Sequence, residues 1–160
     1  MYSREITILP HFQETVISTQ PSEYVISKID AATSSKLLLQ NQNDPTYFFI
    51  GWVREGRFRI SLKINRPNNY LPLVIGNIEP TSNGCIVFLS YRLFPTTKMF
   101  LVFWDLFVLI VSIIAGYQYQ TFLYGVLGVL LVAFIQWVAW SNFNLQLKRT
   151  RELLIDILIH

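Results

Sequence analysis

The chain has 160 residues, of which 52% are hydrophobic and 15% are aromatic. Charged residues make up only 14%, against about 25% in typical soluble domains, and the net charge is +3. This balance argues against the dense basic face of a nucleic-acid-binding domain, and a single cysteine, Cys85, excludes an intramolecular disulfide. Cys85 lies in a strand-like apolar run without a neighbouring histidine or basic group, so we expect a buried core thiol. The apolar excess lies almost entirely beyond Met99.

Residues 1–95 are predicted to form a mixed α and β domain that is dominated by an antiparallel meander. Short apolar stretches indicate strands at 6–9 and 14–18. The first residues contain no apolar run of signal-peptide length, so we expect the domain to stay on the side of the membrane where it is made.

A helix is predicted after the second of these strands. Pro21 suits a first helical turn, and the helix is expected to end near Thr33. Val25, Ile29 and Ala32 would then share one apolar face.

Two strands joined by a tight turn are predicted over 49–53 and 57–64, with Glu55-Gly56 in the turn. Ile50 and Trp52 are expected together on one face of the first strand. In the second strand apolar residues alternate with basic ones. Its apolar face must therefore pack on a core, and its basic face must meet water or an anionic surface.

Two later strands are predicted over 73–78 and 85–93, with a hairpin turn at Asn83-Gly84. Pro95 ends the last strand, and the first apolar helix follows within a few residues. This short connection predicts that the domain sits against the lipid headgroups.

The strongest candidate for a lipid or ligand contact is a basic stripe formed by Arg57, Arg59, Lys63 and Arg66. The stripe has three open interpretations. It is the solvated face of an amphipathic strand, a contact with anionic lipid worth about 1 kcal/mol per cation, or a site for a nucleotide or protein partner.

Two apolar runs within 98–141 predict a transmembrane helical hairpin, with helices at about 99–118 and 121–141. The connection over 118–121 is short and uncharged, so the two helices must be antiparallel neighbours. Orientation follows from the lysine and arginine residues, which gather on the domain side of the hairpin and are absent from the connecting loop. The chain is therefore expected in a bacterial inner membrane or its equivalent, with both termini in the cytoplasm.

Asp105 is the one charged residue in the first apolar run, about 10 Å beyond Lys98 at 1.5 Å per residue. Reflection through the loop centre places Asp105 opposite about residue 134, and Gln136 and Trp137 lie within one helical turn of that point. A structural hydrogen bond or a protonated carboxyl, a contact with a partner subunit, and a proton or ion pathway all remain open.

Gly125 and Gly128, with Ala133, form a predicted strip of small residues on the second membrane helix. Such a strip suits close packing within the hairpin or oligomerisation. Residues 143–160 are expected to continue as an amphipathic C-terminal helix with Leu154 and Leu158 on its apolar face. This helix would pack on its own domain, lie on lipid or bind a partner.

The chain contains few of the residue patterns that are typical of catalytic sites. Its two histidines, His11 and His160, lie far apart in sequence, and no metal-ligand spacing, phosphate-binding glycine loop or paired carboxylates occur in the domain. We therefore predict no catalytic residue, no metal and no cofactor.

The spacing of three segments resembles a group of small uncharacterised bacterial membrane proteins. The segments are Phe49-x-Gly51-x-Val53, Phe58-x-Ile60 and Asn69-Tyr70-Leu71-Pro72-Leu73-x-x-Gly76-x-Ile78. The resemblance covers roughly Thr15 to the end and implies a β-rich front half, a two-helix anchor and a short C-terminal helix. The stretch 64–68 departs from the group's pattern, and no site residue follows from the resemblance.

Taken together, these features predict an α+β membrane protein that acts as a non-catalytic accessory or scaffold subunit at the cytoplasmic membrane face. The expected partners are the bilayer and a membrane protein or further copies of the chain, without nucleic acid. A ligand-sensing or anionic-lipid-binding module is the alternative, and an enzyme is disfavoured.

Overall fold

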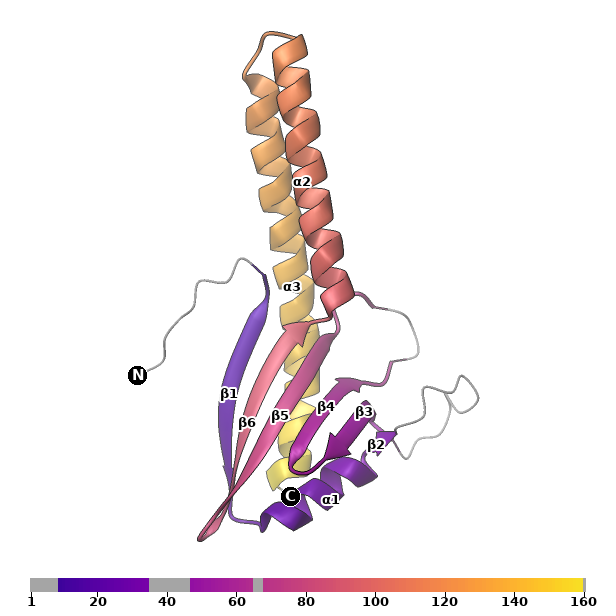
Figure 1. Ribbon diagram of the computed structural model, residues 1–160, viewed down its shortest axis with the longest axis vertical. Helices are drawn as coiled ribbons and strands as arrows, with labels where there is room; N and C mark the ends of the chain where they lie inside the picture. The colour runs from indigo at the N-terminus through magenta and orange to yellow at the C-terminus, as the bar shows by residue number, and fades with distance from the viewer. Residues whose placement is uncertain (1–8, 35–46, 65–67, 160) are drawn as a thin grey trace.

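The computed structural model describes residues 9–34, 47–64 and 68–159 (Figure 1). It confirms the α+β class. The elements in chain order are β1 (His11–Ser18), α1 (Ser22–Ala31), β2 (Thr33–Ser34), β3 (Phe49–Arg54), β4 (Arg57–Leu62), β5 (Pro72–Thr81), β6 (Gly84–Leu93), α2 (Pro95–Gln118) and α3 (Leu123–Ile159).

The strands form one six-stranded sheet in the order β1-β6-β5-β4-β3-β2. The meander from β3 to β6 is antiparallel, as predicted, and only the short β2 pairs with β3 in parallel. The first strand, β1, forms one edge of the sheet and pairs with the last strand, β6, along its whole length. Several boundaries differ from the prediction, because β1 and β5 are longer and α1 and β4 are shorter than expected. The strand expected at 6–9 lies mostly outside the described residues, and Leu9 is not in a strand.

Both predicted hairpin turns are present, with one shift of register. Glu55 and Gly56 adopt φ angles of 48° and 76°, the left-handed pair that a two-residue hairpin turn requires. The second turn consists of Ser82 and Asn83, one residue earlier than predicted, and Gly84 is already the first residue of β6. Close packing accounts for the glycine at this strand position, since a Cβ on Gly84 would lie 2.1 Å from the carbonyl oxygen of Ser18.

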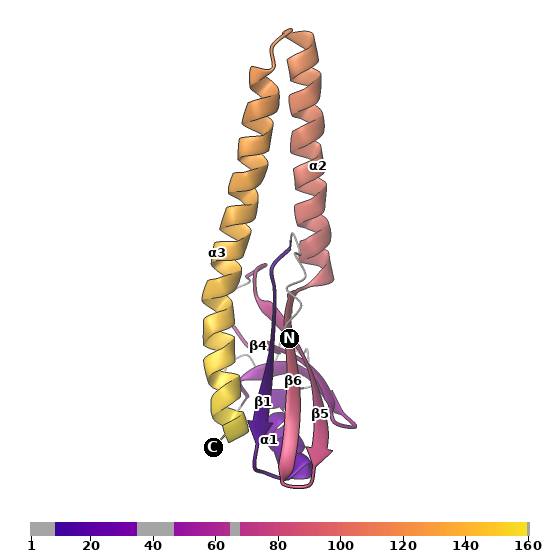
Figure 2. The ribbon, with the colours of Figure 1, turned by 90° about the vertical axis from the view of Figure 1, so that its left-hand side faces the viewer.

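The hydrophobic core lies between one face of the sheet and two helices, α1 and α3 (Figures 1 and 2). We call this side of the sheet the inner face. Alternate residues of β4 and β6, including Phe58, Ile60 and Cys85, are completely buried there. Cys85 is thus a core residue, as predicted, and burial raises the pKa of its thiol.

The C-terminal part of α3 completes this core. Phe143 and Leu154 are fully buried and Leu158 is 2% exposed, so the predicted packing of the tail on its own domain is confirmed. The Ser18 hydroxyl also donates a hydrogen bond of 3.3 Å to the Leu158 carbonyl. Residues 143–159 are not a separate element, because they continue α3, a single helix of 37 residues. Residues 1–95 therefore hold only part of the core that they help to form.

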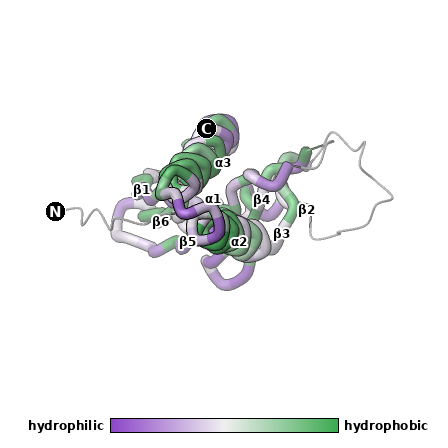
Figure 3. The backbone as a smooth tube through the Cα atoms, turned by 90° about the horizontal axis from the view of Figure 1, so that it is seen from above, coloured by the Kyte–Doolittle hydropathy of each residue, from purple (hydrophilic) through white to green (hydrophobic). Residues whose placement is uncertain are grey.

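The rest of α3 and the whole of α2 form an antiparallel pair that extends beyond the sheet (Figure 1). Both helices are long and apolar enough to cross a membrane by length and composition. In the most apolar stretch of 18 residues, only 6% of α2 and 11% of α3 is buried inside the protein. Neither helix is therefore an ordinary core helix, which would be mostly buried. Figure 3 shows the hydrophobic residues gathered on these helices. The helix α2 starts at Pro95, earlier than predicted, because proline fits a first helical turn.

Candidate functional site

The second face of the sheet, which we call the outer face, is not covered by any element in the described part of the chain. Both α1 and α3 lie on the inner face (Figures 1 and 2). The strand register aligns outer side chains in two rows across the sheet. One row is Gln13, Ser90, Ile75, Arg59 and Trp52, and the other is Thr15, Phe88, Asn77, Arg57 and Arg54.

A groove of about 750 Å³ follows these rows, and we call it the outer groove. Trp52, Ile75 and Phe88 are among the residues that line it. They are 44%, 39% and 42% exposed, although each is a large apolar side chain. Three such residues along one groove offer an apolar surface that water hydrates poorly, and this is typical of an interaction site.

Arginine side chains add positive charge to the same surface. Arg57 and Arg59 line the groove, and Arg54 lies opposite Arg57 in the next strand. Within the described part of the chain, no acidic side chain pairs with these three arginines. Like charges directly opposite in a sheet are destabilising, and a bound anion would remove this repulsion.

The structure thus places only part of the predicted basic stripe in one site. Arg57 and Arg59 lie side by side with the apolar residues, whereas Lys63 lies beyond the end of β4 and is half-buried. Lys63 already has an interaction of its own. The remaining residue of the stripe, Arg66, lies outside the described residues.

The apolar members of the groove were missing from the predicted site. Trp52 could have been found, because the turn at Glu55-Gly56 fixes the register and places Trp52 beside Arg59. Ile75 and Phe88 come from β5 and β6, and their position depends on the register of strands joined through other turns. Their exposure also depends on which face the helices cover.

The predicted pair inside the apolar hairpin is confirmed. The Gln136 amide donates a hydrogen bond of 2.5 Å from Nε2 to Oδ2 of Asp105. The other predicted partner, Trp137, is 66% exposed and packs on Phe134 instead. Asp105 Oδ1 and Gln136 Oε1 are buried without a partner in the described residues.

The predicted strip of small residues reduces to one glycine. Gly128 is buried, and a Cβ there would lie 2.3 Å from the Ser112 hydroxyl oxygen, so this glycine permits close contact between α2 and α3. A Cβ on Gly125 would meet nothing within 4 Å, and Ala133 is exposed. Residues three apart on a helix point about 60° apart, which explains why the two glycines do not share this contact.

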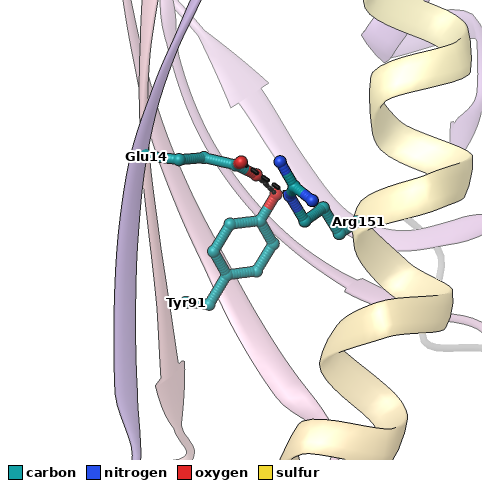
Figure 4. A network of polar contacts seen from close by, with 3 residues as sticks. All are labelled: Glu14, Tyr91 and Arg151. Carbon is teal, nitrogen blue, oxygen red and sulfur yellow. Dashed lines mark hydrogen bonds and ion pairs between the residues drawn. The ribbon is translucent and has the colours of Figure 1, made fainter.

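A polar network on the inner side of the sheet joins β1, β6 and α3 (Figure 4). The Tyr91 hydroxyl donates to Oε1 of Glu14 at 2.8 Å, and Nε of Arg151 donates to Oε2 of the same carboxylate at 2.6 Å. The Tyr91 side chain is fully buried, and burial together with the Glu14 carboxylate raises the pKa of its phenol strongly. Tyr91 therefore stays protonated, and its hydrogen bond orients the Glu14 carboxylate to accept the hydrogen bond from Arg151 of α3.

This network was not foreseen from the sequence. Glu14 and Arg151 are 137 positions apart, and they meet only because β1 pairs with the last strand while α3 returns along the sheet. The described residues hold no group of three or more histidine, cysteine, aspartate or glutamate side chains that could bind a metal. The chemistry available in the outer groove is thus recognition of negative charge and of apolar surface.

Comparisons with known proteins add little to this description. No family model and no curated protein matches the chain. The solution NMR structure of the Polyketide_cyc-like protein Cgl2372 from Corynebacterium glutamicum is similar at 15% identity and a TM-score of 0.28. The similarity covers 79% of this chain and 88% of that protein. A likeness this distant carries no argument about fold or function.

Proposed function

We propose that this chain is a non-catalytic, membrane-anchored accessory or scaffold subunit. It holds its sheet domain at the cytoplasmic face of a membrane and presents the outer face to a partner protein. The observation that carries this proposal is the continuity of α3. One helix belongs both to the apolar hairpin and to the core of the sheet domain, so the domain cannot reorient independently of its anchor.

The exposed side chains of the hairpin support a membrane location. Phe103, Ile113 and Leu130 are 61%, 67% and 59% exposed, and other large apolar residues surround them on both helices. Contact of such a surface with water is unfavourable by about 25 cal/mol per Å². Hydrocarbon or the helices of a membrane partner would remove this surface from water.

The distribution of basic residues supports the proposed orientation. Arg92, Lys98, Lys148 and Arg149 lie where the hairpin meets the domain or within the domain. The loop between α2 and α3, residues 119–122, contains no lysine or arginine. Positive residues favour the cytoplasmic side of a bilayer, so both termini are assigned to that side.

The test is extraction of the full-length chain from membranes of expressing cells. We expect it to stay in the membrane pellet in plain and alkaline buffer and to enter solution only with detergent. Protease added outside intact cells should leave the sheet domain intact, whereas protease added to inverted vesicles should cleave it. A chain that remains dispersed in plain buffer after ultracentrifugation contradicts the proposal.

A ligand-sensing module is the second candidate function. The volume of the outer groove, about 750 Å³, lies within the range of about 300–1,000 Å³ that is common for small-molecule sites. Thermal unfolding of the detergent-solubilised chain with anionic aromatic compounds would detect such binding as an increase in the midpoint temperature.

A further inference from the structure

We propose that the outer groove is a docking site for an extended, acidic segment of a partner protein that carries a large apolar side chain. The apolar side chain would lie against Trp52, Ile75 and Phe88, and carboxylates would pair with Arg57 and Arg59. This inference rests on the proposed function for the location of the partner beside the membrane.

The shape of the groove favours a peptide over a compact small molecule. The row from Gln13 to Trp52 crosses five neighbouring strands, β1, β6, β5, β4 and β3. Four spacings of about 4.8 Å give a length of about 19 Å, which matches five or six residues of extended chain at about 3.3 Å each. Large apolar side chains from β6, β5 and β3 lie along this length, and the arginines lie at its β4 and β3 end.

The charge of the groove selects an acidic segment. Arg57 and Arg59 line the groove without an acidic partner among the described residues, and Arg54 faces Arg57. Glu14 is among the lining residues, but its carboxylate is bound to Tyr91 and Arg151 on the inner side of the sheet. Glu79 accepts a hydrogen bond of 3.0 Å from the Asn77 amide and does not line the groove. Carboxylates bound here would make charge-assisted hydrogen bonds to guanidinium groups, which are stronger than neutral ones.

The direction of the outer face favours a protein over the lipid surface. The strands β1 and β6 run roughly along the same long axis as α2 and α3, and β3 and β4 are inclined to it, so the outer face is turned sideways from that axis (Figures 1 and 2). If the helices cross the membrane, this face looks along the membrane plane. The turn between β3 and β4 lies near α1, at the end of the domain that is distant from the hairpin (Figure 1), and Arg57 is the first residue of β4 after this turn. Continuous α3 prevents the domain from tilting this face onto headgroups.

A second copy of the chain is a poor occupant for the groove. A two-fold symmetric contact places the same surface on both copies, so two outer faces with the same arginine cluster would approach each other. Such a contact juxtaposes like charges, which costs several kcal/mol in an interface. The occupant should therefore carry the opposite charge.

The experiment uses the full-length chain in nanodiscs of zwitterionic phosphatidylcholine. The probe is a fluorescein-labelled hexapeptide of alternating glutamate and phenylalanine, and binding is followed by fluorescence anisotropy. We expect the double variant Arg57→Gln/Arg59→Gln to raise the Kd at least tenfold, and Phe88→Ala to raise it roughly fivefold. The matched control Lys148→Gln/Arg149→Gln removes two exposed cations of α3 and should leave the Kd within twofold.

Two further peptides separate charge from apolar contact. A peptide with lysine in place of glutamate, and one with alanine in place of phenylalanine, should each bind at least tenfold more weakly. Equal binding of the lysine peptide, or an unchanged Kd in Arg57→Gln/Arg59→Gln, overturns the proposal. Circular dichroism confirms that each variant is folded, which is expected because all five substituted positions are exposed.

A further measurement with anionic lipid tests whether lipid headgroups bind to the outer groove in place of a peptide. Nanodiscs that contain phosphatidylserine should leave the affinity of the wild-type chain for the acidic peptide within threefold. If anionic lipid instead abolishes peptide binding in the wild type, the outer face binds headgroups and the proposal is wrong. Membrane extraction is independent of all these measurements, so a failed peptide test leaves the proposed anchoring function intact.

Discussion

The inner and outer faces of the sheet are built from alternate residues of the same strands, but they differ in what covers them. On β6, Val87 and Leu89 face α1 and α3 and are at most 2% exposed, whereas Phe88 between them is 42% exposed. On β4, Phe58 and Ile60 are fully buried, while the arginine between them is exposed. The inner face thus stabilises the fold, and the outer face is available for recognition. Substitutions on the two faces should separate these roles.

The largest effect is expected where α3 enters the core of the inner face. Leu154→Ala removes a fully buried side chain and should lower the free energy of unfolding by about 2–5 kcal/mol, since a cavity remains. Leu153→Ala is the matched control on the same helix, where the side chain is 37% exposed. This substitution should change the free energy of unfolding by less than about 1 kcal/mol. Thermal unfolding in detergent, followed by circular dichroism, measures both. Equal effects would show that α3 does not complete the core.

A smaller loss of stability is expected when a residue on the inner face is made larger than its space. A Cβ on Gly76 would lie 2.0 Å from Cζ of Phe58, whose ring is fully buried and cannot move into solvent. Gly76→Ala should therefore lower the free energy of unfolding by about 1–3 kcal/mol. Gly125→Ala, at a position with open space, is the control and should be neutral or stabilising by up to about 1 kcal/mol. Similar losses at both positions would contradict the packing assigned to β4 and β5.

The polar network of the inner face should give a pH dependence in alkaline solution. Burial and the Glu14 carboxylate raise the pKa of Tyr91 above its ordinary value of 10.0, so the folded chain holds this proton more tightly than the unfolded chain. The resulting stability is fully present below pH 10 and is lost as the pH rises above 10. Tyr91→Phe removes this titration. Chemical unfolding at pH 8 and pH 11 should show a smaller loss for Tyr91→Phe than for the wild type.

Local patterns in the sequence predicted much of the fold but only part of the candidate site. Alternation and turn residues located the hairpins, and the apolar runs located α2 and the first part of α3. Reflection through the loop limited the partners of Asp105 to Gln136 and Trp137, because a short loop leaves two antiparallel helices little freedom of register, and the structure selects Gln136. The outer groove was not predictable in the same way. Its side chains come from five strands, and their exposure depends on α1 and α3 both lying on the opposite face.

The smallest effect on stability is expected on the outer face. Arg57→Gln removes one of two arginines that lie directly opposite each other in the sheet. We expect the free energy of unfolding to stay constant or to rise by up to about 0.5 kcal/mol, because the like-charge repulsion is relieved and no ion pair with a described residue is lost. Thermal unfolding at low salt tests this, and any gain should shrink at high salt as the charges are screened. A loss above about 1 kcal/mol would show that Arg57 supports the fold, and the contrast between the two faces would then fail at a residue of the proposed docking site.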